Sequence, residues 1–77
     1  SVADIVLTGG GGTDLRPAVA TVARARPPAD LVVVLTDGDT PWAPEPPPEN
    51  RSARYVAVLV AGDRHTVPGW LTKIVVP

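Results

Sequence analysis

The stretch that decides the fold lies at residues 31–38 and reads Leu-Val-Val-Val-Leu-Thr-Asp-Gly. Its first five residues are all apolar and mostly β-branched, which is typical of a strand buried on both faces of a parallel sheet. The strand ends abruptly in polar residues, and Asp37 is soon followed by Asp39. In open α/β sheets the ligand crevice lies outside the carboxyl ends of the strands. Asp37 therefore occupies the place where such folds carry their sites.

A second polar loop lies upstream, at residues 9–14, and reads Gly-Gly-Gly-Gly-Thr-Asp. The glycines allow positive φ angles and let the backbone approach a ligand closely. A helix follows this loop, with Thr13 or Asp14 expected as its N-cap and Pro17 in its first turn. Because the loop precedes a helix and then the decisive strand, we expect both polar loops to face the same edge of the sheet.

The remaining pattern predicts one helix and four strands in a single domain, residues 1–77. The helix carries an apolar stripe on 4-3-4 spacing that ends before a pair of prolines, and a proline-rich loop connects two of the strands without a clear helix. These elements are a strand at 3–8, a helix at 14–26 (Leu15, Val19, Val22 and Arg26), strands at 31–36, 55–61 and 71–76, and the loop at 40–50. The order favours a mostly parallel, partial Rossmann-like α/β sheet with one flanking helix.

Together, the glycine loop at 9–14 and the Thr-Asp-Gly that ends the decisive strand resemble the von Willebrand factor A-type domain family. The sequence is most similar to the A-like module at the C-terminal end of predicted bacterial metallopeptidase-related proteins, in which Asp-Thr-Pro-Trp also follows Thr-Asp-Gly, here at residues 39–42. The resemblance covers residues 4–77. It implies a three-layered α/β domain of which this chain holds the C-terminal half, with the N-terminal half missing.

The resemblance also implies a metal-ion-dependent adhesion site at the carboxyl edge of the sheet. That site draws on an Asp-x-Ser-x-Ser loop, on a Thr at a glycine-rich loop and on an Asp that ends a later strand. Thr13 and Asp37 match the second and third segments, whereas the first segment occurs nowhere in the sequence. Hydroxyl and carboxylate oxygens suit Mg²⁺ or another hard divalent cation. Residues expected beside the ion are Gly11, Gly12, Asp14, Gly38, Asp39 and Trp42.

The function implied is a protein-binding module, in which a partner's carboxylate completes the coordination of the ion. Because most of the ligands belong to the absent segment, we expect metal binding by this chain alone to be weak or lacking. An alternative is a haloacid-dehalogenase-like phosphatase with Asp37 as its nucleophile. Such an enzyme also needs a lysine and a second acidic cluster. The only lysine is Lys73, in the last strand, and Asp63 is the only aspartate after the Asp37–Asp39 loop.

A third interpretation is a structural remnant without a site, in which Thr13 caps the helix and Asp37 shapes a turn.

We expect no enzyme activity, since no complete catalytic constellation is present. The glycine loop lacks the lysine of a P-loop and the last glycine of a dinucleotide loop. The sole histidine, His65, excludes a two-histidine zinc-protease motif and is expected to be an exposed loop residue.

The composition of the chain argues against several classes of protein. The net charge of −1 gives no basic footprint for nucleic acid, and the lack of cysteine excludes thiolate zinc sites. No apolar run is long enough for a membrane helix, so we expect a cytoplasmic α/β protein. If half of the domain is missing, the strand at 31–36 has an unpaired edge, which predicts a homo-oligomer or association through that edge.

Overall fold

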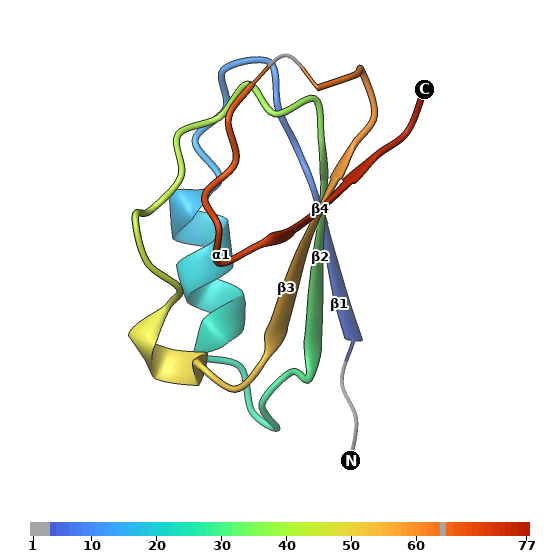
Figure 1. Ribbon diagram of the computed structural model, residues 1–77. Helices are drawn as coiled ribbons and strands as arrows, with labels where there is room; N and C mark the ends of the chain where they lie inside the picture. The colour runs from blue at the N-terminus through green and yellow to red at the C-terminus, as the bar shows by residue number, and fades with distance from the viewer. Residues whose placement is uncertain (1–3, 64) are drawn as a thin grey trace.

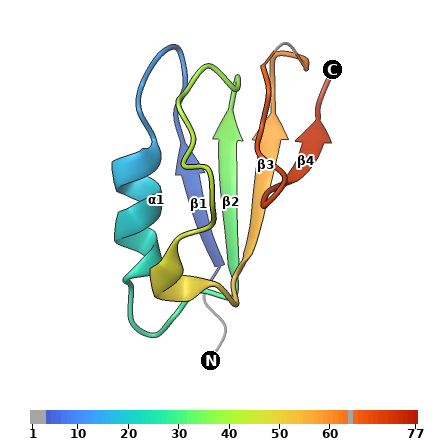
Figure 2. The ribbon, with the colours of Figure 1, turned by 60° about the vertical axis from the view of Figure 1, so that its left-hand side comes forward.

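The computed structural model describes residues 4–63 and 65–77 and contains a four-stranded, all-parallel sheet in the order β1-β2-β3-β4 (Figures 1 and 2). The predicted partial Rossmann-like α/β fold is confirmed, and the strand at 31–36 has the bounds that the sequence indicated. The elements are β1 (Asp4–Thr8), α1 (Arg16–Ala23), β2 (Leu31–Thr36), the 3₁₀ helix η1 (Pro48–Asn50), β3 (Arg54–Leu59) and β4 (Thr72–Val75).

The helix α1 is shorter than its apolar stripe predicted. It ends at Ala23, so Arg26 lies beyond it, and the prediction of a helix as far as Pro27 is wrong. The N–H groups of Arg24 and Ala25 each bond to a carbonyl three residues back, at 3.1 Å, which tightens the last turn ahead of the two prolines. Within the described residues, no helix is long and apolar enough to cross a membrane.

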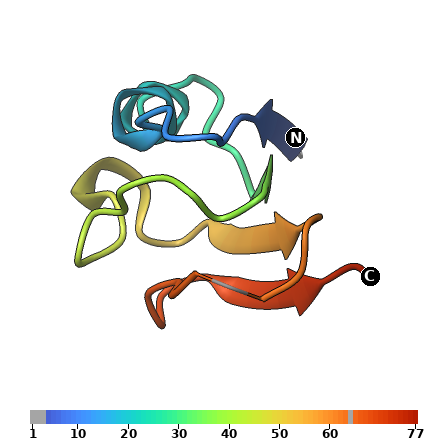
Figure 3. The ribbon, with the colours of Figure 1, turned by 90° about the horizontal axis from the view of Figure 1, so that it is seen from above.

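The hydrophobic core lies between one face of the sheet and α1. Successive strand residues alternate between the two faces, so Val32 and Val34 of β2 and Tyr55 and Ala57 of β3 point to the helix side, where all four are buried. Leu15, at the start of α1, is buried in the same cluster. Figure 3 shows that α1 and the connection from β2 to β3, with η1, lie on this side of the sheet.

The crossover from β2 to β3 is made by irregular proline-rich chain that ends in η1. A buried amide holds this connection in place, because the side-chain N–H of Asn50 donates to the carbonyl of Ala29 at 2.9 Å. Its side-chain oxygen accepts from the N–H of Ala53 at 3.2 Å, and its carbonyl accepts from the Tyr55 hydroxyl at 2.7 Å. In a helical crossover the backbone polar groups bond to one another within the helix. In this irregular connection the bonds of Asn50 satisfy such groups instead.

The prediction of an unpaired edge along β2 is wrong. β2 pairs with β1 from Leu31 to Leu35 and with β3 from Leu31 to Thr36, so it lies inside the sheet. The segment at residues 4–8 forms a full parallel strand and fills the side of β2 that we expected to be open. The edge strands of the described sheet are β1 and β4.

Candidate functional site

The carboxyl ends of the parallel strands meet at one edge, which carries the glycine loop after β1 and the Asp37 turn after β2 (Figure 1). The structure brings these two loops into direct contact. The N–H of Gly11 lies 3.2 Å from each carboxylate oxygen of Asp37, and the N–H of Gly12 donates to the carbonyl of Asp39 at 2.8 Å. The convergence expected from the sequence is therefore present in the backbone.

Asp37 is held as a carboxylate by backbone donors. The N–H of Asp39 donates to Oδ1 at 2.9 Å, and this bond, followed by those from Gly11, lowers the pKa of Asp37 below its ordinary value. Desolvation opposes the shift, and the nearby charge of His65 adds to it. The side chain is only half-buried, so the ionised group remains open to solvent and to a ligand.

A dependence of stability on pH follows from this lowered pKa. A carboxyl group with a lower pKa in the folded state adds stability at pH values above its unfolded pKa, near 3.8, and that stability disappears as the pH falls through the folded pKa. We expect wild type to exceed Asp37→Asn in unfolding free energy at pH 7, with the difference shrinking below pH 3.8. Urea titrations of both proteins from pH 7 to pH 2.5 measure this difference. If the unfolding free energies of the two proteins changed with pH in the same way, the hydrogen bonds to the Asp37 carboxylate would add nothing to stability.

Thr13 does not cap the helix, so the prediction that Thr13 or Asp14 is the N-cap is wrong. Leu15 occupies the N-cap position, because burying its side chain in the core starts the helix one residue later. The N–H of Leu15 is satisfied instead by the Thr40 hydroxyl, at 3.0 Å. Thr13 is exposed, and its hydroxyl makes no hydrogen bond within the part of the chain that the structure describes. The group is thus available to a ligand.

Asp14 is engaged with its neighbour Arg16. Its Oδ1 accepts the backbone N–H of Arg16 at 2.9 Å, and its Oδ2 forms an ion pair with that guanidinium at 2.9 Å. The side-chain hydrogen bonds from Arg16 lower the pKa of Asp14. Both side chains are exposed, so the pair stabilises the start of α1 only modestly. Asp14 is therefore a weaker candidate ligand than Asp37.

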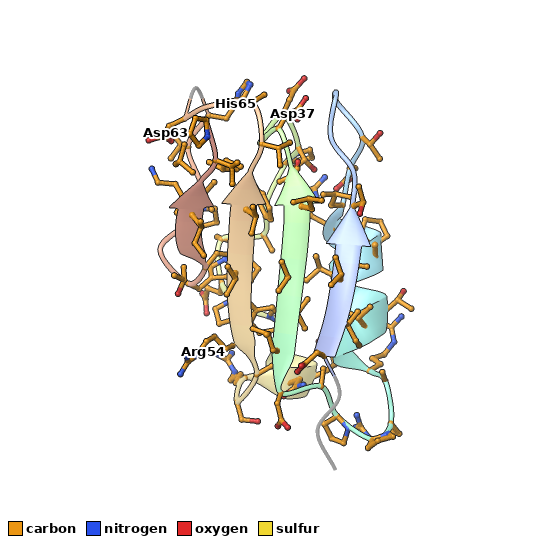
Figure 4. All side chains as sticks on the ribbon, turned by 90° about the vertical axis from the view of Figure 1, so that its right-hand side faces the viewer. Asp37, Arg54, Asp63 and His65 are labelled. Carbon is orange, nitrogen blue, oxygen red and sulfur yellow. The ribbon has the colours of Figure 1, made fainter. Side chains whose placement is uncertain are left out.

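His65 belongs to the same edge, which the sequence analysis missed. Gly38 has a φ of 87°, and a Cβ placed there would lie 3.1 Å from Cβ of His65, so the histidine lies against the Thr-Asp-Gly turn. Figure 4 shows His65 beside Asp37 at the end of the sheet. The signal was available: His65 follows the strand at 55–61, the expected parallel neighbour of the strand at 31–36. Loops after neighbouring parallel strands meet at the same edge.

Trp42 lies in a different place from Asp37. Its ring packs on the core, and with Trp70 and the prolines of the connection it lines a groove of about 270 Å³ on the helix side. Asp37 does not line this groove. The indole N–H of Trp70 donates to the carbonyl of Ala43 at 2.9 Å, which fixes the groove wall. Trp42 therefore belongs to this groove and not to the edge that carries Asp37.

The oxygen donors at this edge are of the type that binds a hard cation, but they are too few to complete its coordination. Thr13 and Asp37 offer oxygen ligands of the type that Mg²⁺ and Ca²⁺ prefer, yet they fill at most two of about six positions. No cluster of three or more His, Cys, Asp or Glu that could hold a metal occurs among the described residues. Lys73 binds Asp63 at 3.0 Å, so the only lysine is already paired.

The comparisons with known proteins agree with this architecture. The family described as "VWA-like domain (DUF2201)" matches residues 1–76. The comparison with curated proteins and the comparison with solved structures gave no match. The family match covers nearly the whole chain, including the glycine loop, the Thr-Asp-Gly turn and the four parallel strands. The chain therefore belongs to the VWA-like domain family, a type of protein-interaction module.

Proposed function

We propose that the carboxyl edge of the sheet binds a protein partner, and that Thr13 and Asp37 hold a hard divalent cation there. The observation that carries this proposal is the pair of hydrogen bonds from Gly11 to the Asp37 carboxylate, which joins the two loops at one edge. When bound, such an ion supplies an open coordination position that a carboxylate of the partner fills. An exposed Thr13 hydroxyl and an ionised Asp37 suit that role.

The surrounding residues give Asp37 its position. Backbone donors from the glycine loop and from Asp39 leave the carboxylate little freedom to rotate, so less entropy is lost when it takes up a ligand. The N–H of Gly38 donates to the Thr36 hydroxyl at 3.1 Å, which fixes the turn that presents Asp37. The exposed side chain of Asp39 adds negative charge near the ion without a fixed protein partner among the described residues.

Titration with Mn²⁺, followed by electron paramagnetic resonance and by calorimetry, tests the metal part of this proposal. With two protein ligands we expect weak binding, with a dissociation constant of about 1 mM or higher. Asp37→Asn should weaken binding at least about tenfold, since it removes the only charged ligand. Asp63→Asn is the matched control, because it removes an acid near the same edge whose carboxylate is already bound to Lys73.

Thr13→Ala should also weaken Mn²⁺ binding while leaving the unfolding free energy within about 0.5 kcal/mol of wild type, since Thr13 is not a cap. The double variant with Asp37→Asn should lose little more than the single variants, because one ion needs both oxygens. Equal binding by wild type and Asp37→Asn would contradict the proposal. An equally large loss of Mn²⁺ affinity in Asp63→Asn would show that the overall negative charge, and not Thr13 with Asp37, attracts the ion.

The same variants test the phosphatase alternative. We expect no hydrolysis of an aryl phosphate with Mg²⁺ by wild type, because the lysine that such an enzyme needs is bound to Asp63. Hydrolysis that disappears in Asp37→Asn and persists in Asp63→Asn would replace the binding proposal with an enzymatic one.

A further inference from the structure

A groove on the helix side of the sheet lies apart from the two polar loops of the carboxyl edge. It has a volume of about 270 Å³ and is bordered by α1, by the connection from β2 to β3 and by Trp70, which precedes β4. Figures 2 and 3 show α1 and η1 next to each other on this side. We call it the tryptophan groove, and most of its lining is apolar: Val19, Ala20, Trp42, Pro47, Pro48 and Trp70. A concave apolar surface is a common place for a ligand or a partner segment to bind.

Trp70 offers this groove an apolar ring that is held in one place. Its indole N–H donates to the carbonyl of Ala43 at 2.9 Å, so its only polar group is used within the chain. Its ring meets that of the buried Tyr55 edge to face, with the ring centroids 5.3 Å apart and the planes at 83°. A ring that is already fixed loses little conformational freedom when a ligand packs on it. This wall of the groove is therefore suited to apolar contact rather than to hydrogen bonding.

Prolines of the connection form another wall of the groove. Pro47 has a φ of −56° and a ψ of 125°, in the polyproline II region. Because Pro47 and Pro48 have no N–H, this wall cannot donate to the backbone of a ligand, which excludes the addition of a β-strand here. A ligand in the polyproline II conformation needs no such pairing, since it is preformed and has no internal hydrogen bonds.

The charges at the groove narrow the choice of ligand further. Glu45 and Glu49 line it, are exposed, and form no ion pair within the described part of the chain. Arg16 lines it as well, but its guanidinium is bound to Asp14 at 2.9 Å. Two uncompensated carboxylates beside an apolar surface favour a ligand that carries a basic side chain. They disfavour the proline run of a second copy, because that run is flanked by the same two glutamates.

We propose that the tryptophan groove binds a proline-rich segment of a partner protein in the polyproline II conformation, with an arginine or lysine next to its prolines. The prolines pack on Trp42 and Trp70, and the basic side chain pairs with Glu45 or Glu49. The groove is smaller than most small-molecule sites, which have roughly 300–1,000 Å³, so it holds only a short part of the segment. We expect a dissociation constant of roughly 100 µM to 1 mM. Asp37 does not line the groove, so this contact needs no metal ion.

The probe for this proposal is a blocked peptide of about six prolines, two turns of polyproline II, with an arginine at each end. The fluorescence of Trp42 and Trp70 and calorimetry follow its binding to the 77-residue chain in buffer with EDTA, since the peptide has no tryptophan. Glu45→Arg combined with Glu49→Arg should weaken binding at least about tenfold, and should strengthen binding of the same peptide with a glutamate at each end. Ala20→Leu should also weaken binding at least about tenfold, because the larger side chain occupies the groove while leucine keeps a high helix propensity.

Asp4→Arg combined with Asp30→Arg is the matched control, since it makes the same change in net charge at two exposed acids that do not line the groove. It should leave binding of the peptide unchanged. Circular dichroism of each variant checks that the fold is kept.

The proposal is overturned if the proline peptide with arginines does not bind at concentrations up to about 5 mM. It is also overturned if a glycine-serine peptide with the same arginines binds as tightly, or if the control variant loses as much affinity as the glutamate variant, because charge alone would then account for binding. Wild-type affinity in the glutamate variant would contradict it as well. A change of tryptophan fluorescence with protein concentration alone would assign the groove to a second copy of the chain instead.

Discussion

Replacement of Leu59 by alanine should lower the unfolding free energy by about 2–5 kcal/mol, the largest loss that we expect from a single side chain. Leu59 ends β3, is fully buried and lies under the Thr-Asp-Gly turn, since a Cβ on Gly38 would be 3.4 Å from its Cδ2. Truncation leaves a cavity below the site. Domains of 77 residues are stable by roughly 4–12 kcal/mol, so the variant approaches the limit of folding.

Urea titrations followed by the fluorescence of Trp42 and Trp70 measure this loss. Val75→Ala is the control, because Val75 is the register partner of Leu59 on β4 but is 43% exposed, and it should cost less than about 1 kcal/mol. Weaker Mn²⁺ binding by folded Leu59→Ala is also expected, since the turn loses its support. Equal losses in the two variants would show that β3 and β4 pack with the same density, contrary to their burial.

The sequence predicted the structure correctly where one strong local pattern determined it. An apolar run of β-branched residues has few alternatives to a buried parallel strand, and the bounds of β2 followed from it. The meeting of the glycine loop with Asp37 followed as well, because loops at the carboxyl ends of the parallel strands of one sheet lie at the same edge. The fold class and the position of the two polar loops could therefore be predicted from local patterns together with one topological rule.

Features that depend on tertiary contacts were not predictable in the same way. Two polar residues ahead of the helix looked like caps, but burial of Leu15 moved the cap position and left Thr13 free. The neighbour of β2 was assigned wrongly because a strand as short as 4–8 gives little evidence of its partner. His65 is a single residue in a loop. It becomes a candidate site residue only because the structure places that loop beside Gly38.

Replacement of Gly10 by alanine should separate the two loops of the site. Gly10 has a φ of 153°, which a residue with a side chain adopts at a cost of about 1–3 kcal/mol. A methyl group there would also overlap Oδ1 of Asp37 and lie 3.0 Å from the Thr36 hydroxyl. Relief requires the loop to move away from Asp37, so the hydrogen bonds from Gly11 are lost. We expect a total cost of about 2–4 kcal/mol.

Gly12→Ala separates this effect from backbone strain alone. Gly12 also has a positive φ, 90°, but a methyl group there meets nothing within 4 Å, so the loop keeps its contact with Asp37. Carboxyl titration by nuclear magnetic resonance should therefore show the pKa of Asp37 rising toward its ordinary value in Gly10→Ala, because one set of its donors is gone, and remaining low in Gly12→Ala. Mn²⁺ affinity should fall in the first variant alone. An unchanged pKa of Asp37 in folded Gly10→Ala would mean that the glycine loop does not hold the carboxylate, and the proposed site would lose its structural basis.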